Sequence, residues 1–168
     1  MTAAGERAPG TAPDEAARTA VEADIPQVVA LAGAAAAEKL GQKGGTLWAR
    51  REARPAPQEA ALRSAWESPE HEVAVGTLDG VVVGYGVVRA ETLRDGGLLG
   101  VIEDIYVDPG ARAVGVGETL MNHLIDWCCD RGCFGVDSLA LPGDRDTKNF
   151  FESFGLVARA IVVHRPLS

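Results

Sequence analysis

Residues 71–107 constrain the fold more than any other part of the sequence. They contain three β-rich runs, "HEVAVGTL", "VVVGYGVVRAETL" and "LLGVIEDIYV", separated by two short turns. Asp79-Gly80 favours a tight two-residue hairpin, and Arg94–Gly97 marks the second turn. Three strands joined in this way predict an antiparallel meander.

Helical patterns flank this meander on both sides. Asp24 can cap a helix, Pro26 is tolerated in its first turn, and Gly41 ends the apolar period. The expected helices cover 24–40, 58–68, 115–131 and 144–154, and further strands are expected at 18–22, 133–142 and 156–167. The basic, proline-broken stretch Thr46–Pro57 is expected to be a loop. The order β-α-α-β-β-β-α-β-α-β indicates one mixed α/β domain with a central, mostly antiparallel sheet.

Length and composition set the domain organisation. A chain of 168 residues has room for one domain with a substantial core. Residues 1–17 are rich in Ala, Gly, Pro and acids, so we expect a disordered tail there and a folded domain over 18–168. The tail lacks a basic stretch followed by an apolar one, and no long apolar run occurs, so we expect neither a signal peptide nor a membrane span. The expected location is the cytoplasm.

Charge and ligand-type residues exclude several function classes. The net charge of −8 disfavours nucleic-acid binding through a basic face and is compatible with a small cationic substrate. The cysteines Cys128, Cys129 and Cys133 form one cluster without nearby histidines, a poor match to a zinc site. His71, His123 and His164 are far apart in the sequence. We therefore expect no metal.

The strongest functional pattern is the turn Arg112-Ala113-Val114-Gly115-Val116-Gly117, which lies between a strand and a helix. Successive backbone N–H groups and a helix N-terminus form a pocket for an anion such as pyrophosphate. A dinucleotide fingerprint would need a third glycine where Leu120 stands. A phosphate-binding Walker loop would need lysine after the second glycine, where Glu118 stands.

With this turn placed after the meander, the sequence resembles the GNAT superfamily of acetyl-CoA-dependent N-acetyltransferases. Three motifs in the family's order carry the resemblance over roughly residues 18–166. They are the opening "RTAVEADIPQVVAL", the Arg-x-x-Gly-x-Gly signature at Arg112, Gly115 and Gly117, and the late "NFFESFGL".

The resemblance implies acetyl-CoA as co-substrate and assigns residues to it. Backbone groups of Ile105, Tyr106 and Val107 would pair with the pantetheine arm, in a gap where the strand diverges from its neighbour. The amides of Arg112, Ala113, Val114, Gly115, Val116, Gly117 and Glu118 would hold the pyrophosphate. Asn149 and Phe151 would contact the cofactor, and Trp48 would lie on the acceptor side.

Glu103 and Asp104 stand next to each other just before this gap. Acetyl transfer requires a neutral amine, and removing the proton from a lysine-like amine at pH 7 costs roughly 4–5 kcal/mol. A nearby carboxylate could accept that proton. The pair most closely resembles the diamine acetyltransferase branch, with Glu103 as base and Asp104 as a substrate contact. On a regular strand the two point to opposite faces unless a bulge reorients them.

One departure from the family concerns the leaving thiolate, which a tyrosine hydroxyl usually protonates. Phe151 occupies that position. Water, Tyr85 or Tyr106 could take over the role, or the protein could be a non-enzymatic acyl-CoA-binding module or a purely structural partner-binding domain. We expect direct transfer, because no cysteine lies in an activating setting. The sequence leaves four kinds of acceptor open: polyamine-like amines, aminoglycosides, amino acids and protein amines. For the assembly of the chain, a homodimer is considered.

Overall fold

The computed structural model describes residues 12–167 and shows an α/β domain built on one five-stranded sheet. The strands follow chain order: β1 (Glu15–Thr19), β2 (His71–Leu78), β3 (Val81–Thr92), β4 (Leu98–Val107) and β5 (Val136–Ser138). The first four pair antiparallel, and β5 pairs with β4 in parallel. The predicted meander and mixed α/β class are confirmed.

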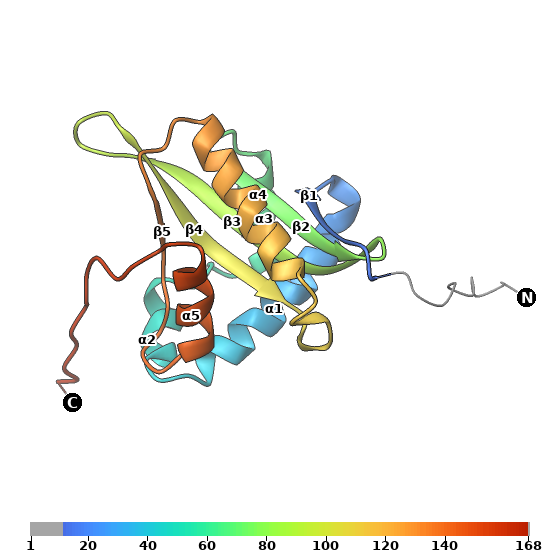
Figure 1. The fold of residues 1–168 in the computed structure, drawn as a ribbon. Helices are drawn as coiled ribbons and strands as arrows, with labels where there is room; N and C mark the ends of the chain where they lie inside the picture. The colour runs from blue at the N-terminus through green and yellow to red at the C-terminus, as the bar shows by residue number, and fades with distance from the viewer. Residues whose placement is uncertain (1–11, 168) are drawn as a thin grey trace, which may run out of the picture.

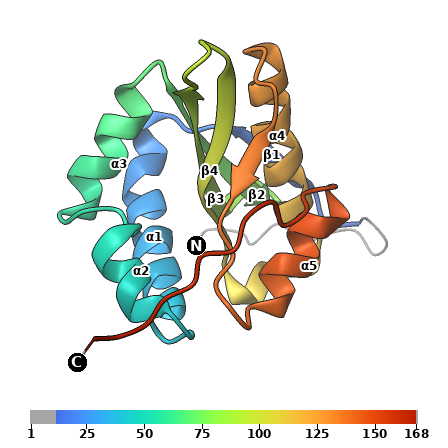
Figure 2. The ribbon, with the colours of Figure 1, turned by 90° about the vertical axis from the view of Figure 1, so that its left-hand side faces the viewer.

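The described residues form five α-helices around the sheet (Figure 1). They are α1 (Ile25–Leu40), α2 (Gly45–Arg51), α3 (Gln58–Glu67), α4 (Val116–Asp130) and α5 (Arg145–Ser153), with short 3-10 turns at Glu22–Asp24 and Pro109–Ala111. Figure 2 shows the sheet between two layers, with α1 and α3 on one face and α4 on the other. No helix among residues 12–167 is long and apolar enough to cross a bilayer.

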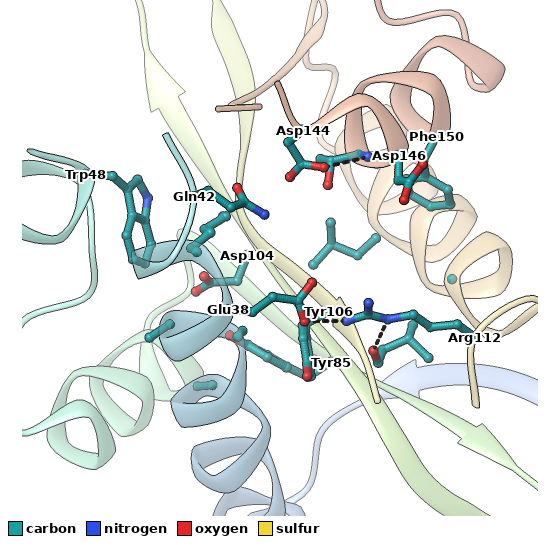
Figure 3. A pocket seen from close by; sticks show the side chains of 18 of the residues that line it. Glu38, Gln42, Trp48, Tyr85, Asp104, Tyr106, Arg112, Asp144, Asp146 and Phe150 are labelled. Carbon is teal, nitrogen blue, oxygen red and sulfur yellow. Dashed lines mark hydrogen bonds and ion pairs between the residues drawn. The ribbon is translucent and has the colours of Figure 1, made fainter. Parts of the chain in front are cut away.

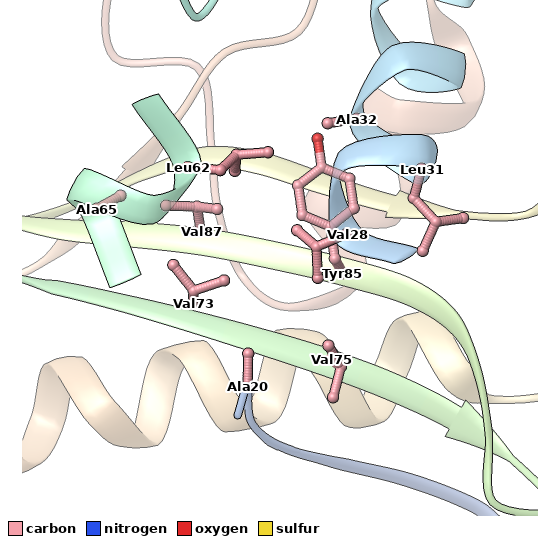
Figure 4. Close-up of a cluster of buried hydrophobic side chains, with 10 residues drawn as sticks. All are labelled: Ala20, Val28, Leu31, Ala32, Leu62, Ala65, Val73, Val75, Tyr85 and Val87. Atoms are coloured by element: carbon pink, nitrogen blue, oxygen red, sulfur yellow. The ribbon is translucent and has the colours of Figure 1, made fainter. Parts of the chain in front are cut away.

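Each face of the sheet carries its own core. The face beneath α1 and α3 buries Tyr85, Val87 and Val73 against Leu62 and Val28 (Figure 4). The opposite face packs Ile102, Val88 and Ala74 beneath α4. The alternation of side chains along β2 and β3 supplies both sets, because neighbouring residues of a strand point to opposite faces.

Glycines bring α4 close to the sheet. A Cβ at Gly76 would lie 2.6 Å from a methyl of Val116, one at Gly86 would lie 2.8 Å from Leu124, and one at Gly100 would lie 2.4 Å from the sulfur of Cys128. Such distances are well inside van der Waals contact, so only glycine permits this spacing. The helix is therefore seated directly on the backbone of β2, β3 and β4.

Two parts of the predicted order need correction. The stretch predicted as a loop contains α2, which begins after Gly44 in the left-handed conformation and carries no side-chain cap. The strand predicted over 156–167 is absent, since this segment is irregular and makes no backbone ladder in the described chain. Apolar alternation indicates a strand, but a strand also needs a partner edge.

The beginning of the chain also differs in detail. The first strand was predicted at 18–22 and is observed as β1 at Glu15–Thr19, so it takes in residues 15–17 of the predicted tail. Residues 1–11 of that tail lie outside the described residues. Asp24 stands at the N-cap position of α1, but its carboxylate accepts from the Val21 N–H and the Arg18 guanidinium instead of capping.

Candidate active site

A cavity of about 510 Å³ opens between α1, β4 and α5 (Figure 3). The register of the sheet explains its position. β4 pairs with β5 only from Gly100 to Ile102, whereas its pairing with β3 continues to Val107. Beyond Ile102, therefore, β4 has an edge without a strand partner in the described chain. The expected divergence of strands is present, and this edge forms one wall of the cavity.

The wall residues come from separate parts of the chain, within 32–58, at Tyr85, within 104–118 and within 144–150. They are Ala32, Ala35, Ala36, Glu38, Lys39, Gln42, Trp48, Arg54, Gln58, Tyr85, Asp104, Ile105, Tyr106, Val107, Arg112, Ala113, Gly115, Gly117, Glu118, Asp144, Asp146, Thr147 and Phe150.

One end of the cavity is made of backbone. Ala113 and Gly115 both adopt left-handed conformations, with φ of 65° and 95°, before α4 begins at Val116. Positive φ is uncommon for alanine, and alternating conformations of this kind turn successive N–H groups inwards. Gly115 supplies no capping side chain, so the first N–H groups of α4 lack a side-chain partner there. This end has the geometry of an anion site.

Arg112 fixes the position of that turn. Its Nε donates to the carbonyl of Val107 at 2.9 Å, and a terminal nitrogen donates to a carboxylate oxygen of Glu38 on α1 at 2.7 Å. The hydrogen bond with Glu38 raises the pKa of Arg112 although partial burial opposes it. The guanidinium also lies 5.3 Å from the ring centre of Tyr106. Arg112 thus links the turn to β4 and α1.

The other end is made of charged side chains, and a β-bulge organises it. The β3–β4 register shifts so that Asp104 faces Val87 while Ile102 faces Val88, leaving Glu103 as the extra residue. Ile102 and Ile105 both pack in the core beneath α4. Glu103 and Asp104 therefore point together to the opposite face, towards α1 and α3. From the sequence, the two acids were expected to share one face only if a bulge reoriented them, and this bulge does so.

Arg54 joins the two acids. Its guanidinium donates to Asp104 at 2.6 Å and to Glu103 at 3.1 Å, and its side chain is only 12% exposed. Burial disfavours its charged form, yet the charge and hydrogen bond of Asp104 and the charge of Glu103 raise its pKa overall. Glu103 also pairs with Arg89 at 3.0 Å. The two acids therefore lie in one ion-pair network with Arg54 and Arg89.

Tyr85 lies beside this network and is 1% exposed. Burial raises the pKa of its hydroxyl well above the ordinary value, and the neighbouring Asp104 charge raises it further. In Figure 4 the hydroxyl points away from the sheet towards Ala32 of α1. The group is therefore a neutral hydroxyl on the cavity wall throughout the physiological pH range.

The structure brings most of the sequence candidates to the cavity. Ten of them line it: Trp48, Asp104, Ile105, Tyr106, Val107, Arg112, Ala113, Gly115, Gly117 and Glu118. Glu103, Val114, Val116, Asn149 and Phe151 are not among its wall residues. Phe151 is 7% exposed in the core beneath α4, and the aromatic side chain that reaches the cavity from α5 is Phe150.

Several wall residues had no sequence signal. Arg54 stands 50 positions before its partner Asp104, and only the fold brings them together. Gln42 lines the cavity with a side-chain oxygen that is buried without a hydrogen-bond partner in the described structure. Buried polar atoms normally have partners. This oxygen is therefore an acceptor free to bind a ligand.

Residues 42–156 match the acetyltransferase (GNAT) family. This chain belongs to the GNAT family. A solved structure of a Bacillus halodurans protein, the BH1408 tetramutant, shares the fold with a TM-score of 0.75 and 18% identity, covering 90% of this chain and 99% of that one. The aminoglycoside N-acetyltransferase AAC(6')-Iy, solved in complex with CoA, shares it with a TM-score of 0.70 and 14% identity, covering 95% and 99%.

Among curated proteins, the GNAT chain is similar to glucosamine 6-phosphate N-acetyltransferase 1 of Oryza sativa subsp. japonica. The two are 29% identical over 90 residues, which is 54% of this chain and 52% of the relative. A Trypanosoma brucei brucei protein of the same name is 31% identical over 72 residues, 43% of this chain and 47% of the relative. The match thus spans about half the length of each relative, and neither is named as a diamine acetyltransferase.

Proposed function

We propose that this GNAT protein transfers the acetyl group of acetyl-CoA directly to a primary amine of a small cationic acceptor. The observation that carries the proposal is that one cavity joins a backbone anion site at the start of α4 to the charged network at the β4 bulge. Acetyl transfer needs both ends, one to hold the phosphates of CoA and one to receive an amine.

The turn fits a pyrophosphate group. Gly115 has a positive φ that side chains tolerate poorly, and a Cβ on Gly117 would stand 3.4 Å from Phe150 at the cavity wall. The carboxylate of Glu15 lies beside Gly115, with an oxygen 3.1 Å from the position of a Cβ there. The lack of side chains at both glycines lets a phosphate approach the N–H groups of α4 closely. From there the free edge of β4, at Ile105–Val107, offers backbone groups along which a pantetheine arm can lie and deliver its thioester towards Asp104.

Asp104 is the acid best placed to meet the amine, because it lines the cavity and Glu103 does not. In the proposed reaction its carboxylate attracts the ammonium group and accepts a proton from it, directly or through water. The neutral nitrogen then attacks the thioester carbonyl, so that a C–N bond forms and the C–S bond breaks. Glu103, predicted from sequence as the base, would hold Arg54 in position.

Tyr85 is the proposed proton donor to the departing thiolate. It is the hydroxyl on the cavity wall with a pKa raised by burial and by Asp104, so it carries a proton at neutral pH. Phe151 cannot take this part, since it has no hydroxyl and packs in the core. The attacking nitrogen loses a second proton as the amide forms, and this proton restores the Tyr85 hydroxyl after it has protonated the sulfur. The first proton passes from Asp104 to solvent, so protons and bonds balance.

The charge of the wall favours a cationic acceptor. Five carboxylates line the described cavity, against three cationic side chains. Of the cations, Arg54 is held by Asp104 and Glu103, and Arg112 by Glu38. Asp144 and Asp146 add negative charge where α5 begins, across the cavity from Trp48 (Figure 3). At the acceptor end, Asp104, Asp144 and Asp146 favour an ammonium group over a phosphate on the acceptor.

An amino-sugar phosphate is the second candidate acceptor, because the curated relatives are named for glucosamine 6-phosphate. Lys39 is the observation in its favour. Its ammonium lies 5.1 Å from the ring centre of Trp48 on the cavity wall, where it could meet a phosphate.

One assay distinguishes the acceptors. Release of CoA thiol from acetyl-CoA would be measured with spermidine, glucosamine and glucosamine 6-phosphate at equal concentrations. We expect kcat/KM to fall in that order. Fastest turnover of glucosamine 6-phosphate would overturn the cationic acceptor and retain acetyl transfer. No turnover of any amine, combined with tight acetyl-CoA binding, would instead favour a non-enzymatic binding module.

A further inference from the structure

Three cysteines lie around the C-terminal end of α4, and the proposed acetyl transfer uses none of them. Cys128 is 1% exposed, Cys133 is half-buried and Cys129 is exposed. All three are free thiols, and none of them is among the described wall residues of the cavity. Any chemistry at these thiols is therefore independent of the acetyl-transfer site.

The backbone after α4 folds into a cap that brings two of these cysteines together. The N–H of Cys133 donates to the carbonyl of Cys128 at 2.9 Å, and the N–H of Gly132 donates to the carbonyl of Cys129 at 2.9 Å. Gly132 has a φ of 71°, in the left-handed region. These features define a Schellman motif, in which the residue after the glycine contacts the helix residue whose carbonyl it binds. Here those two residues are Cys133 and Cys128.

The two side chains share one environment. Cys128 is buried in the core beneath α4, and Cys133 packs against that core. Burial raises the pKa of the Cys128 thiol to about 12, and the charge and hydrogen bond of Cys133 contribute to this rise. On its other side the Cys128 sulfur touches β4, since a Cβ on Gly100 would lie 2.4 Å from it. The sheet therefore limits how far this sulfur can move away from Cys133.

The backbone geometry meets the requirement of a disulfide bond. Disulfides join cysteines whose Cα atoms lie about 4.4–6.8 Å apart. With standard backbone bond lengths, the hydrogen bond between Cys133 and Cys128 holds their Cα atoms within about 6.8 Å. Cys129 follows Cys128 on the helix, so its side chain points about 100° away around the axis and reaches solvent. The cap therefore favours the pair Cys128–Cys133 over any pair that includes Cys129.

We propose that Cys128 and Cys133 form a reversible disulfide, and that a low-molecular-weight disulfide such as oxidised glutathione is the oxidant. The half-buried Cys133 loses its proton and attacks the S–S bond of the reagent, which gives a mixed disulfide and one reagent thiol. The Cys128 sulfur then attacks the Cys133 sulfur, loses its proton and releases the second reagent thiol. Two protein thiols are oxidised and one reagent disulfide is reduced to two thiols, which take up the two protons.

The new bond closes a loop in a region that the fold already orders. The chain runs from the end of α4 directly to β5 (Figure 1). On the way, the N–H of Phe134 donates to the carbonyl of Leu98 at 2.8 Å, and the carbonyl of Gly135 accepts from the N–H of Gly100 at 2.9 Å. The folded protein therefore needs little rearrangement to form the bond, whereas the unfolded chain loses freedom. Oxidation stabilises the folded state for this reason.

The first test maps the disulfides by tandem mass spectrometry after incubation with oxidised glutathione and alkylation of the remaining thiols. In folded wild type, the Cys128–Cys133 link should exceed any link to Cys129 at least about tenfold, because the cap raises the effective concentration of one thiol beside the other. The preference should disappear in guanidinium chloride. Cys129→Ser is the matched control and should keep the link, whereas Cys133→Ser should abolish it. Dithiothreitol should restore all thiols.

The second test measures the melting temperature before and after oxidation. It should rise by about 3 °C or more in wild type and Cys129→Ser, and should stay unchanged in Cys133→Ser. A glutathione adduct that persists on Cys133 without a link to Cys128 would overturn the proposal. The same pairing ratio in folded and unfolded protein, or a melting temperature that oxidation of wild type leaves unchanged or lowers, would overturn it equally.

Discussion

The two ends of the cavity are built in different ways. The end at Arg112–Gly117 uses backbone N–H groups of consecutive residues, and its shape follows from local conformation. The end at Asp104 uses side chains that come from α2, the segment after it, β3 and β4 and meet only in the folded protein. The first should tolerate few side chains of any kind, whereas the second should respond to the identity of each charged group.

The largest expected effect is at the backbone end. Gly117→Glu should weaken acetyl-CoA binding on the order of 100-fold or more, because a carboxylate would stand in the anion site. Gly117→Ala should bind within about fivefold of wild type, since its Cβ would be in ordinary contact, 3.4 Å from Phe150. Calorimetric titration of the folded variants decides this. Unchanged affinity in Gly117→Glu would remove the pyrophosphate from this turn.

The second prediction separates the two acids at the side-chain end. Asp104→Asn should reduce kcat roughly 100-fold or more, within the usual range for a positioned base. Glu103→Gln should reduce it less, because Glu103 contacts two arginines and is absent from the cavity wall.

The pH profile provides the readout for this pair. The loss in Asp104→Asn should diminish at high pH, where the free amine is already neutral. If Asp104→Asn kept the wild-type kinetics and pH profile while Glu103→Gln lost most of its kcat, Glu103 would be the base, as predicted from the sequence. The bulge would then serve to present Glu103.

The third prediction concerns the proton donor. Tyr85→Phe should lower kcat roughly tenfold or more without changing acetyl-CoA affinity, because it removes only the hydroxyl. Phe151→Tyr should give no gain in rate and should lower the free energy of unfolding by about 1–3 kcal/mol, since it places an unpaired hydroxyl in the core. A gain in rate from Phe151→Tyr would instead show that this side chain reaches the sulfur.

The smallest expected effect is at Trp48. Trp48→Ala should raise the acceptor KM about threefold to tenfold and leave acetyl-CoA affinity within about twofold, because Trp48 lines the side-chain end far from the α4 turn. Trp48→Phe is the control, since it keeps an aromatic ring beside Lys39. Steady-state kinetics measures both. A loss of acetyl-CoA affinity with the acceptor KM unchanged would instead place Trp48 on the acetyl-CoA side of the cavity.

The same contrast explains what the sequence could predict. The Asp79-Gly80 hairpin, the end of α1 at Gly41 and the turn at Arg112–Gly117 depend on neighbouring residues, and all appear as predicted. Arg54 could not be predicted, because its contact with Asp104 crosses 50 residues. The bulge at Glu103 reverses the expected alternation of one residue pair. Only the pairing with β3 reveals it.

The two errors of secondary structure have physical causes as well. α2 has no capping side chain and is followed by Pro55 and Pro57, so local signals favour a loop. The last segment has the composition of a strand but pairs with no strand of the described chain. Propensity describes what a segment can become, and tertiary contacts decide whether it does.

The glycines beneath α4 have a consequence for how variants of this protein would be interpreted. Gly76, Gly86 and Gly100 lie on strands, outside the cavity wall, yet each supports the helix whose first turn forms the backbone end of the cavity. A saturation screen scored by acetyl transfer would mark all three as intolerant, alongside Gly115 and Gly117. Activity alone would not tell the two groups apart. The amount of folded protein would tell them apart. A side chain at Gly76, Gly86 or Gly100 pushes α4 away from the sheet and lowers that amount, whereas alanine at Gly117 leaves it unchanged.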